Sequence, residues 1–112
     1  MATIALGRLN VPEAKAALVS ATDDENDMIR GWAVAGLGRM WGNDALEQLS
    51  QALLDDPAPT VRRQAIMALT AIGSDEAIGF LRLATDDPDN GVSRVAEHNI
   101  EFLQGQREAE GL

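Results

Sequence analysis

The clearest helical pattern in the chain lies near its middle, directly after a pair of aspartates. Apolar residues there follow the i, i+4, i+7, i+8 and i+11 spacing of a helix with one buried face, namely Val61, Ala65, Ala68, Leu69 and Ile72. Pro59 stands in the first turn, where a missing N–H costs no hydrogen bond. Asp55 and Asp56 come just before, where the helix dipole favours negative charge. The pattern predicts an acidic turn followed by a helix over 59–72.

This stretch has two counterparts in the chain. Asp23-Asp24 precedes Ile29, and Asp86-Asp87-Pro88 precedes Val92, each followed by apolar residues at similar spacing. Ile29, Val61 and Val92 are 32 and 31 residues apart. A repeat of this period indicates stacked structural units.

A further helical pattern lies before each acidic turn, so each unit holds two helices. Helices are expected over 12–22, 28–41, 44–54, 59–72, 75–85 and 91–104. Leu6-Gly7-Arg8 matches Leu37-Gly38-Arg39, which makes residues 2–10 the back half of an earlier unit. The prediction is a single repeat domain over 1–105, with a half-repeat at 2–10, repeats at 11–42, 43–73 and 74–105, and a frayed polar tail at 106–112.

The turn and second helix carry a family motif. It runs through Asp56, Val61-Arg62, Ala65, Ala68-Leu69 and Ile72-Gly73. This resembles the hallmark of HEAT repeats, in particular the short variety named after phycobilisome lyases. The resemblance covers about residues 2–104 and implies an all-α fold: an α-solenoid, forming a right-handed superhelix of about three HEAT-like helical hairpins plus an N-terminal half-repeat.

The third unit departs from the motif at positions that would face a following unit. Ser93 replaces the arginine found at positions 30 and 62, Glu97 replaces an apolar residue, and Asn99 replaces a small one. Terminal repeats need a polar outer face. The C-terminal end is therefore expected to be a true end of the solenoid.

Charge and composition narrow the classes of partner. The net charge is −9, which argues against nucleic acid and against an anionic membrane surface. The chain has no cysteine, no apolar run of membrane-spanning length and no recognisable signal peptide, so the cytoplasm is the expected compartment.

Arg30 and Arg62 stand in the first turns of their helices. They could bind anions, but the family resemblance implies that they pair with turn carboxylates such as Asp55 or Asp86 and tie adjacent repeats together.

The second helices of HEAT units usually line the concave surface of the solenoid. Aligning them predicts a candidate binding patch of Arg8, Trp32, Arg39, Arg63, Met67, Arg94, His98 and Phe102. Aromatic residues, Met and Arg are the types that protein interfaces enrich. The alternative is that Trp32 and Phe102 merely cover helix ends.

Metal and cofactor chemistry finds little support. His98 is the only histidine and no cysteine exists, so a transition-metal site lacks ligands. The di-iron hydroxylases built from HEAT-like repeats need repeated His-Glu pairs, and this chain has one Glu97-His98 step. The segment 86–97 has the length of a calcium loop, including Gly91 and a final Glu97, but Pro88 cannot serve as the third ligand. No metal and no cofactor are predicted.

The favoured function is a non-catalytic scaffold that holds a protein or peptide on its concave face. The resemblance also suggests an accessory subunit or fragment of a bilin lyase or isomerase, and less strongly a HEAT-like DNA-repair protein, which the acidic charge opposes. Ile4, Leu6 and Leu9 lack a first-helix partner. They predict an N-terminal edge covered by a longer parent chain or by self-association.

Overall fold

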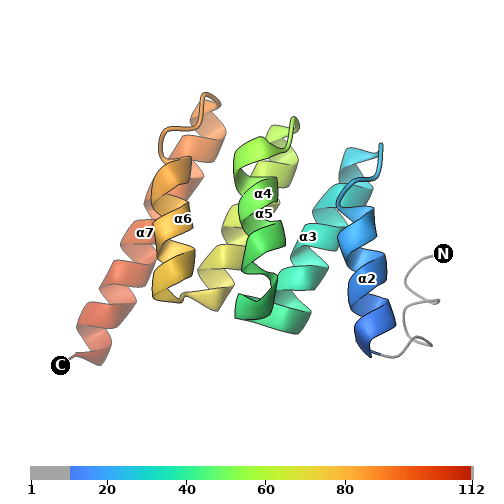
Figure 1. Ribbon diagram of the computed structural model, residues 1–112. Coiled ribbons are helices and arrows are strands. Elements are labelled where there is room, and N and C mark those ends of the chain that lie inside the picture. Colours follow the sequence, from blue (N-terminus) through green and yellow to red (C-terminus); the bar gives the residue numbers. More distant parts are fainter. Residues whose placement is uncertain (1–10, 112) are drawn as a thin grey trace.

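The computed structural model describes residues 11–111 as two layers of helices (Figure 1). The first helix of each repeat lies in one layer: α2 (Val11–Ala21), α4 (Leu46–Asp55) and α6 (Asp75–Ala84). The second helix lies behind it: α3 (Asp27–Trp41), α5 (Pro59–Ile72) and α7 (Asn90–Glu110). A short 3-10 turn, η1 (Gly42–Ala45), leads into α4. The predicted all-α solenoid is confirmed.

Local sequence signals account for the helix ends. The side chains of Ser74 and Asp89 accept hydrogen bonds from the N–H groups of Ala77 and Val92 and so cap α6 and α7. Pro59 opens α5 at its first helical position. Gly73 ends α5 in the left-handed conformation, with φ 65°, which a residue with a Cβ adopts only at a cost.

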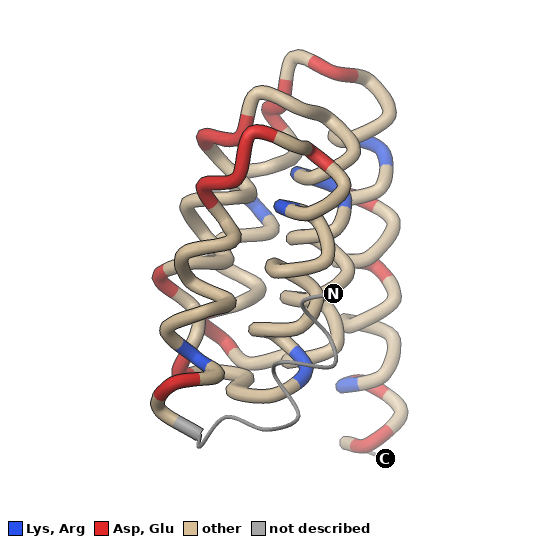
Figure 2. Tube along the Cα trace, turned by 90° about the vertical axis from the view of Figure 1, so that its right-hand side faces the viewer, with Lys and Arg blue, Asp and Glu red and all other residues tan. Residues whose placement is uncertain are grey.

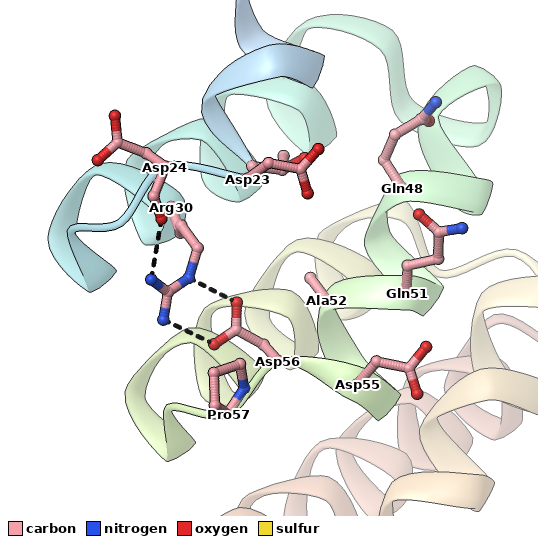
Figure 3. Close-up of a pocket in the computed structure, with 10 residues that line it drawn as sticks. Asp23, Asp24, Arg30, Gln48, Gln51, Ala52, Asp55, Asp56 and Pro57 are labelled. Carbon is pink, nitrogen blue, oxygen red and sulfur yellow. Dashed lines mark hydrogen bonds and ion pairs between the residues drawn. The ribbon is translucent and has the colours of Figure 1, made fainter.

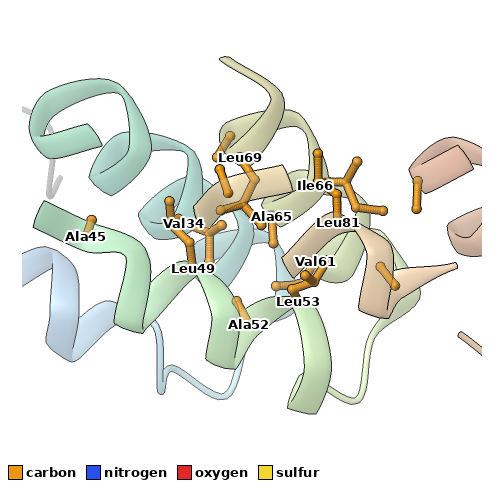
Figure 4. Packing of buried hydrophobic residues seen from close by; sticks show 14 of the residues in the cluster. Val34, Ala45, Leu49, Ala52, Leu53, Val61, Ala65, Ile66, Leu69 and Leu81 are labelled. Carbon is orange, nitrogen blue, oxygen red and sulfur yellow. The ribbon is translucent and has the colours of Figure 1, made fainter. Parts of the chain in front are cut away.

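The core runs continuously between the two layers (Figure 4). Leu37, Leu49 and Leu69 lie at its centre and are all 0% exposed. Small residues let the second helices pack closely, since Ala33, Ala65 and Ala96 are buried at equivalent positions. Helix α5 contacts α3, α4, α6 and α7, so the middle repeat holds the two outer ones together.

The closest approach between repeats lies where α3 crosses α5. A Cβ placed on Gly38 would stand 2.7 Å from the Cβ of Ala68, which is shorter than real side chains tolerate. Gly36, two residues earlier, would meet only the Leu18 side chain at 3.5 Å, an ordinary contact. Gly38 is therefore required by the spacing of the first two repeats, and Gly36 is not.

Several predicted boundaries need correction. Helix α7 continues to Glu110 instead of fraying after residue 105, and Arg107 donates to the Gly73 carbonyl at 3.3 Å and pairs with Asp75 at 2.7 Å. The side chain of Asn26 caps α3 by accepting from the N–H of Met28, so the helix begins at Asp27, one residue before the predicted start. Leu54 in α4 is 46% exposed. The predicted half-repeat at 2–10 lies outside the described residues.

Candidate binding surface

Two arginines link neighbouring repeats through paired hydrogen bonds. Arg30 in α3 donates from Nε and Nη2 to the two carboxylate oxygens of Asp56, at 2.9 and 3.1 Å (Figure 3). Arg62 in α5 makes the same pair of bonds to Asp87, at 2.8 and 3.1 Å. Each guanidinium also donates to a backbone carbonyl in the turn before its own helix, that of Asp24 or Asp56. These four side chains are 7–13% exposed, so each arginine binds one carboxylate and leaves little surface for a free anion.

The acidic partners are Asp56 and Asp87, each one residue later than the predicted Asp55 and Asp86. The reason is local. Asp56 follows α4 in extended conformation, and its Oδ1 also accepts the N–H of Ala58, which turns its carboxylate toward Arg30. Asp55 is still the last residue of α4 and is exposed. Asp87 makes the equivalent bond to the N–H of Asp89.

Asp56 also affects the ionisation of its partner. Its hydrogen bonds and charge raise the pKa of Arg30 above the ordinary arginine value, against a smaller lowering by burial. An arginine side chain is not deprotonated in proteins, so the guanidinium of Arg30 carries its positive charge beside Asp56.

Acidic residues gather at one edge of the molecule, where the turns inside the three repeats stack (Figure 2). Its carboxylates, which we call the acidic edge, belong to Asp23, Asp24, Glu25, Asp27, Asp55, Asp56, Asp86, Asp87 and Asp89. Arg30 and Arg62 neutralise one carboxylate in each of the second and third turns.

The second helices expose large apolar side chains on the face away from α2, α4 and α6. Trp32 is 68% exposed, Met67 55% and Phe102 53%, and each comes from a different second helix. Ile29, Val61 and Val92 occupy equivalent positions in the three helices, and Trp32, Met67 and Phe102 stand three, six and ten residues after them. They therefore step down by about one turn of 5.4 Å from one helix to the next. We call this diagonal the apolar ridge.

A groove runs beside the ridge between α3 and α5. Asp27, Met28, Gly31 and Trp32 line it from α3, and Thr60, Val61 and Gln64 line it from α5. Gly31 leaves space for the side chain of Gln64, whose Cγ would lie 3.5 Å from a Cβ at that position. Met28, 63% exposed, was missed by the sequence reasoning. It stands four residues before Trp32, so helical spacing already placed it on the same face.

The predicted basic residues of this face divide into two groups. Arg39, Arg94 and His98 are exposed and available to a partner. Arg63 is half-buried, because its guanidinium lies against the start of α7, 3.0 Å from where a Cβ on Gly91 would be. Arg8 lies outside the described residues. The surface thus combines an apolar ridge with three exposed basic side chains.

Other kinds of site find no support in the part of the chain that the structure describes. Between residues 11 and 111, no three His, Cys, Asp or Glu side chains come together in a way that could hold a metal ion. No helix in the same range is long and apolar enough to cross a membrane.

Comparison with known proteins agrees with this architecture. A family model described as HEAT repeats matches the chain twice, over residues 1–69 and 30–101. The second match begins 29 residues after the first, close to one repeat, as expected of units that stack at a constant period. A search of the curated proteins found no match. HEAT repeats typically serve as scaffolds for protein interactions and not as enzymes. With matches that cover most of its length, the chain belongs to the HEAT-repeat family.

Proposed function

We propose that this protein is a non-catalytic binding module that holds a segment of another protein on its second-helix face. The observation that carries the proposal is the apolar ridge. Trp32, Met67 and Phe102 are each more than half exposed, although each of these helices also buries apolar residues in the core. Large apolar side chains in a row, one from each repeat, are costly in water unless a partner covers them.

The spacing of the side chains in the apolar ridge indicates how far apart the apolar side chains of the partner should be. Neighbouring second helices lie about 8–10 Å apart, and each step also drops by about 5 Å, so successive anchors stand about 10 Å apart. Two turns of a partner helix, or three residues of an extended segment, span the same distance. The partner should therefore present two or three apolar side chains at this interval.

The charges of the face describe it further. Arg39, Arg94 and His98 are exposed beside the ridge, so acidic residues flanking the apolar anchors would complement them. Binding energy should come mainly from the aromatic and methionine anchors, with the charges setting orientation and association rate.

To test the proposal, peptides that bind the full chain are selected from a random display library. Their affinity is then measured for the native chain, for a triple variant of the ridge and for a double variant that serves as the control. The ridge variant replaces Trp32, Met67 and Phe102 by Ala. The matched control replaces Leu54 and Leu83, which are 46% and 54% exposed on α4 and α6 in the other layer. We expect the ridge variant to lose at least tenfold in affinity and the control less than twofold. Selected peptides that bind the ridge variant as well as the native chain would refute the proposal.

The bilin lyase or isomerase alternative rests on the resemblance to phycobilisome lyases alone. It requires a pocket for a pigment, whereas the two grooves formed between repeats are open at the surface. Adding a free bilin to the protein tests it directly, because a bound bilin changes its absorption spectrum. An unchanged spectrum at micromolar protein would remove the alternative. Failure to bind duplex DNA at low salt would likewise remove a DNA-repair role.

A further inference from the structure

The groove between α3 and α5 has a counterpart between α5 and α7, because the second helices follow one another at the period of the repeat. Gly31 of α3 corresponds by register to Arg63 of α5, and Thr60 of α5 corresponds to Gly91 of α7. One wall of each junction therefore comes from the same position of the repeat. That position holds a glycine at the first junction and an arginine at the second.

Arg63 spans the second junction with its own side chain. Its Nη1 and the Oδ1 of Asp89 both lie 3.0 Å from the point that a Cβ on Gly91 would occupy, at the start of α7. The carboxylate offsets the positive end of the helix dipole, which would otherwise repel a cation. The molecule thus places a guanidinium between two of its second helices, beside a carboxylate at the start of one of them.

The first junction has the space for such a side chain but not the side chain itself. Gly31 carries no Cβ, and one added there would meet nothing closer than the Cγ of Gln64 at 3.5 Å. Within residues 11–111, no basic residue lines the groove, whose volume is about 290 Å³. Pockets for whole small-molecule ligands begin at about 300 Å³. The groove is therefore suited to one long side chain of a bound segment.

The walls of this groove match the two parts of an arginine side chain. Met28 and Trp32 are exposed and offer apolar surface to the methylene groups, and an indole ring is a preferred stacking partner of a guanidinium. Asp27 places a carboxylate at the start of α3, and Thr60 places a hydroxyl at the start of α5. Within residues 11–111, the Asp27 carboxylate takes part in no ion pair.

We propose that the groove between α3 and α5 receives an arginine side chain of the segment that binds the apolar ridge. This inference rests on the proposed function and identifies one anchor of the partner. The guanidinium stacks on Trp32 and pairs with Asp27, as Arg63 fills the next junction beside a carboxylate. Because Arg94 and His98 are exposed on α7, the segment carries positive charge at its α3 end and negative charge at its α7 end. It therefore binds in one direction.

The first experiment uses the two tryptophans of the full chain as reporters. Trp32 lines the groove, whereas Trp41 ends α3 about 13 Å further along the helix. N-acetyl-arginine methylamide is added at millimolar concentration, and the indole N–H signals are followed by NMR. N-acetyl-citrulline methylamide, which has a similar shape and no charge, is the control compound.

We expect the arginine compound to shift the Trp32 signal in a saturable way and to leave Trp41 unchanged, with the citrulline compound binding about fivefold more weakly. A Trp32 signal that does not respond to the arginine compound, or responds equally to both compounds, overturns the inference. An equal response to the corresponding lysine compound overturns the choice of arginine.

Gly31→Arg gives the first junction the residue that the second already has. The new side chain should fill the groove and abolish the response of Trp32. Gly31→Ala is the matched control, since its methyl group meets Gln64 at an ordinary distance and leaves the groove open. Asp27→Asn should weaken binding by about fivefold, and Glu25→Gln, an exposed acid of the same turn, by much less.

Thermal melting shows that the variants fold, and Gly31→Arg should melt no lower than Gly31→Ala. Undiminished binding to folded Gly31→Arg overturns the inference. If Gly31→Arg does not fold, undiminished binding to Asp27→Asn overturns it.

The peptides selected on the full chain separate this inference from the proposed function. Ridge-dependent peptides should carry an arginine, and its replacement by citrulline should weaken binding about tenfold to the native chain but not to Gly31→Arg. Ridge-dependent peptides without arginine would overturn the inference and leave the proposed function intact. Conversely, binding of the arginine compound at Trp32, in the absence of any ridge-dependent peptide, would overturn the proposed function alone.

Discussion

The two ends of this solenoid are built differently. The C-terminal repeat satisfies its own outer surface: Ser93 and Asn99 donate to carbonyls of their own helix, and α7 extends past the core to pair Arg107 with Asp75. The N-terminal repeat leaves Ile29 and Met40 exposed on its outer side. The outer side of the last repeat thus carries polar side chains bonded within its own helix, whereas the outer side of the first repeat carries exposed apolar side chains.

The difference shows how a repeat protein specifies an end. Both outer repeats keep the buried leucine of the first helix, since Leu18 and Leu81 are 9% and 0% exposed. They differ in the residues that would meet a further neighbour. The last repeat has polar residues and an extended helix on its outer side, where the first repeat has exposed apolar residues.

The largest expected effect tests whether the two ends belong to one cooperative unit. Leu69 is 0% exposed in α5, the helix that contacts both outer repeats. Leu69→Ala should lower the free energy of unfolding by about 2–5 kcal/mol. Urea denaturation should show tryptophan fluorescence, which reports α3, and circular dichroism, which reports all helices, changing together. A loss below about 1 kcal/mol would show that α5 does not hold the ends together.

The next effect separates the inner and outer sides of the first repeat. Gly38→Ala places a methyl group 2.7 Å from the Ala68 Cβ and should destabilise by about 1–3 kcal/mol by forcing α3 from α5. Gly36→Ala is the matched control, because its methyl group meets Leu18 at an ordinary distance. It should stabilise the helix by about 0.5–1 kcal/mol. Equal effects of the two substitutions in thermal denaturation would show that the junction is not tightly packed.

A smaller effect compares the carboxylates of the two outer turns. Asp87→Asn removes the charge that binds Arg62 while keeping the hydrogen bond of the turn, and should cost about 1–2 kcal/mol. Asp24→Asn makes the same chemical change where no arginine is bound, and should change stability by less than about 0.5 kcal/mol. Chemical denaturation of both variants measures the difference. If Asp24→Asn cost as much as Asp87→Asn, the proposed asymmetry between the ends would be wrong.

The smallest effect concerns the extension of α7. The Arg107 and Asp75 side chains are 50% and 84% exposed, so solvent screens their attraction. Arg107→Gln should therefore cost less than about 1 kcal/mol. Its clearer signature should be faster amide exchange at the end of α7, with the rest of the helix unchanged. Faster exchange throughout α7 would mean that the extension stabilises the whole last repeat.

The fold could be predicted because the acidic turns and the apolar stripes of the helices recur along the chain with the same period. The bounds of α5 were predicted to the residue, since Pro59 and Gly73 mark its ends and its apolar stripe is unbroken. Helix α7 was predicted too short, because its last turns are polar and carry no periodic signal. The contacts of Arg107 with Gly73 and Asp75, which come from the preceding connection and α6, become visible only in three dimensions.

The candidate site, like the fold, could be predicted from the sequence only in part. Exposure of Trp32, Met67 and Phe102 followed from aligning the second helices, because equivalent positions of a repeat occupy equivalent places. The partners of Arg30 and Arg62 were each predicted one residue too early. The sequence alone does not distinguish two adjacent aspartates. The backbone conformation at the end of α4 decides which of them faces the arginine.

The acidic edge concentrates negative charge on one side of the solenoid. Nine carboxylates line the side of the molecule where the turns within repeats stack, and two arginines offset only part of that charge. Like charges on stacked turns repel one another. This repulsion favours a wider spacing between repeats on the acidic side of the solenoid than on the opposite side. Salt screens this repulsion over about 10 Å at 0.1 M, and the repulsion acts over longer distances in dilute solution. The curvature of the module, and with it the distance between its binding anchors, should therefore respond to ionic strength.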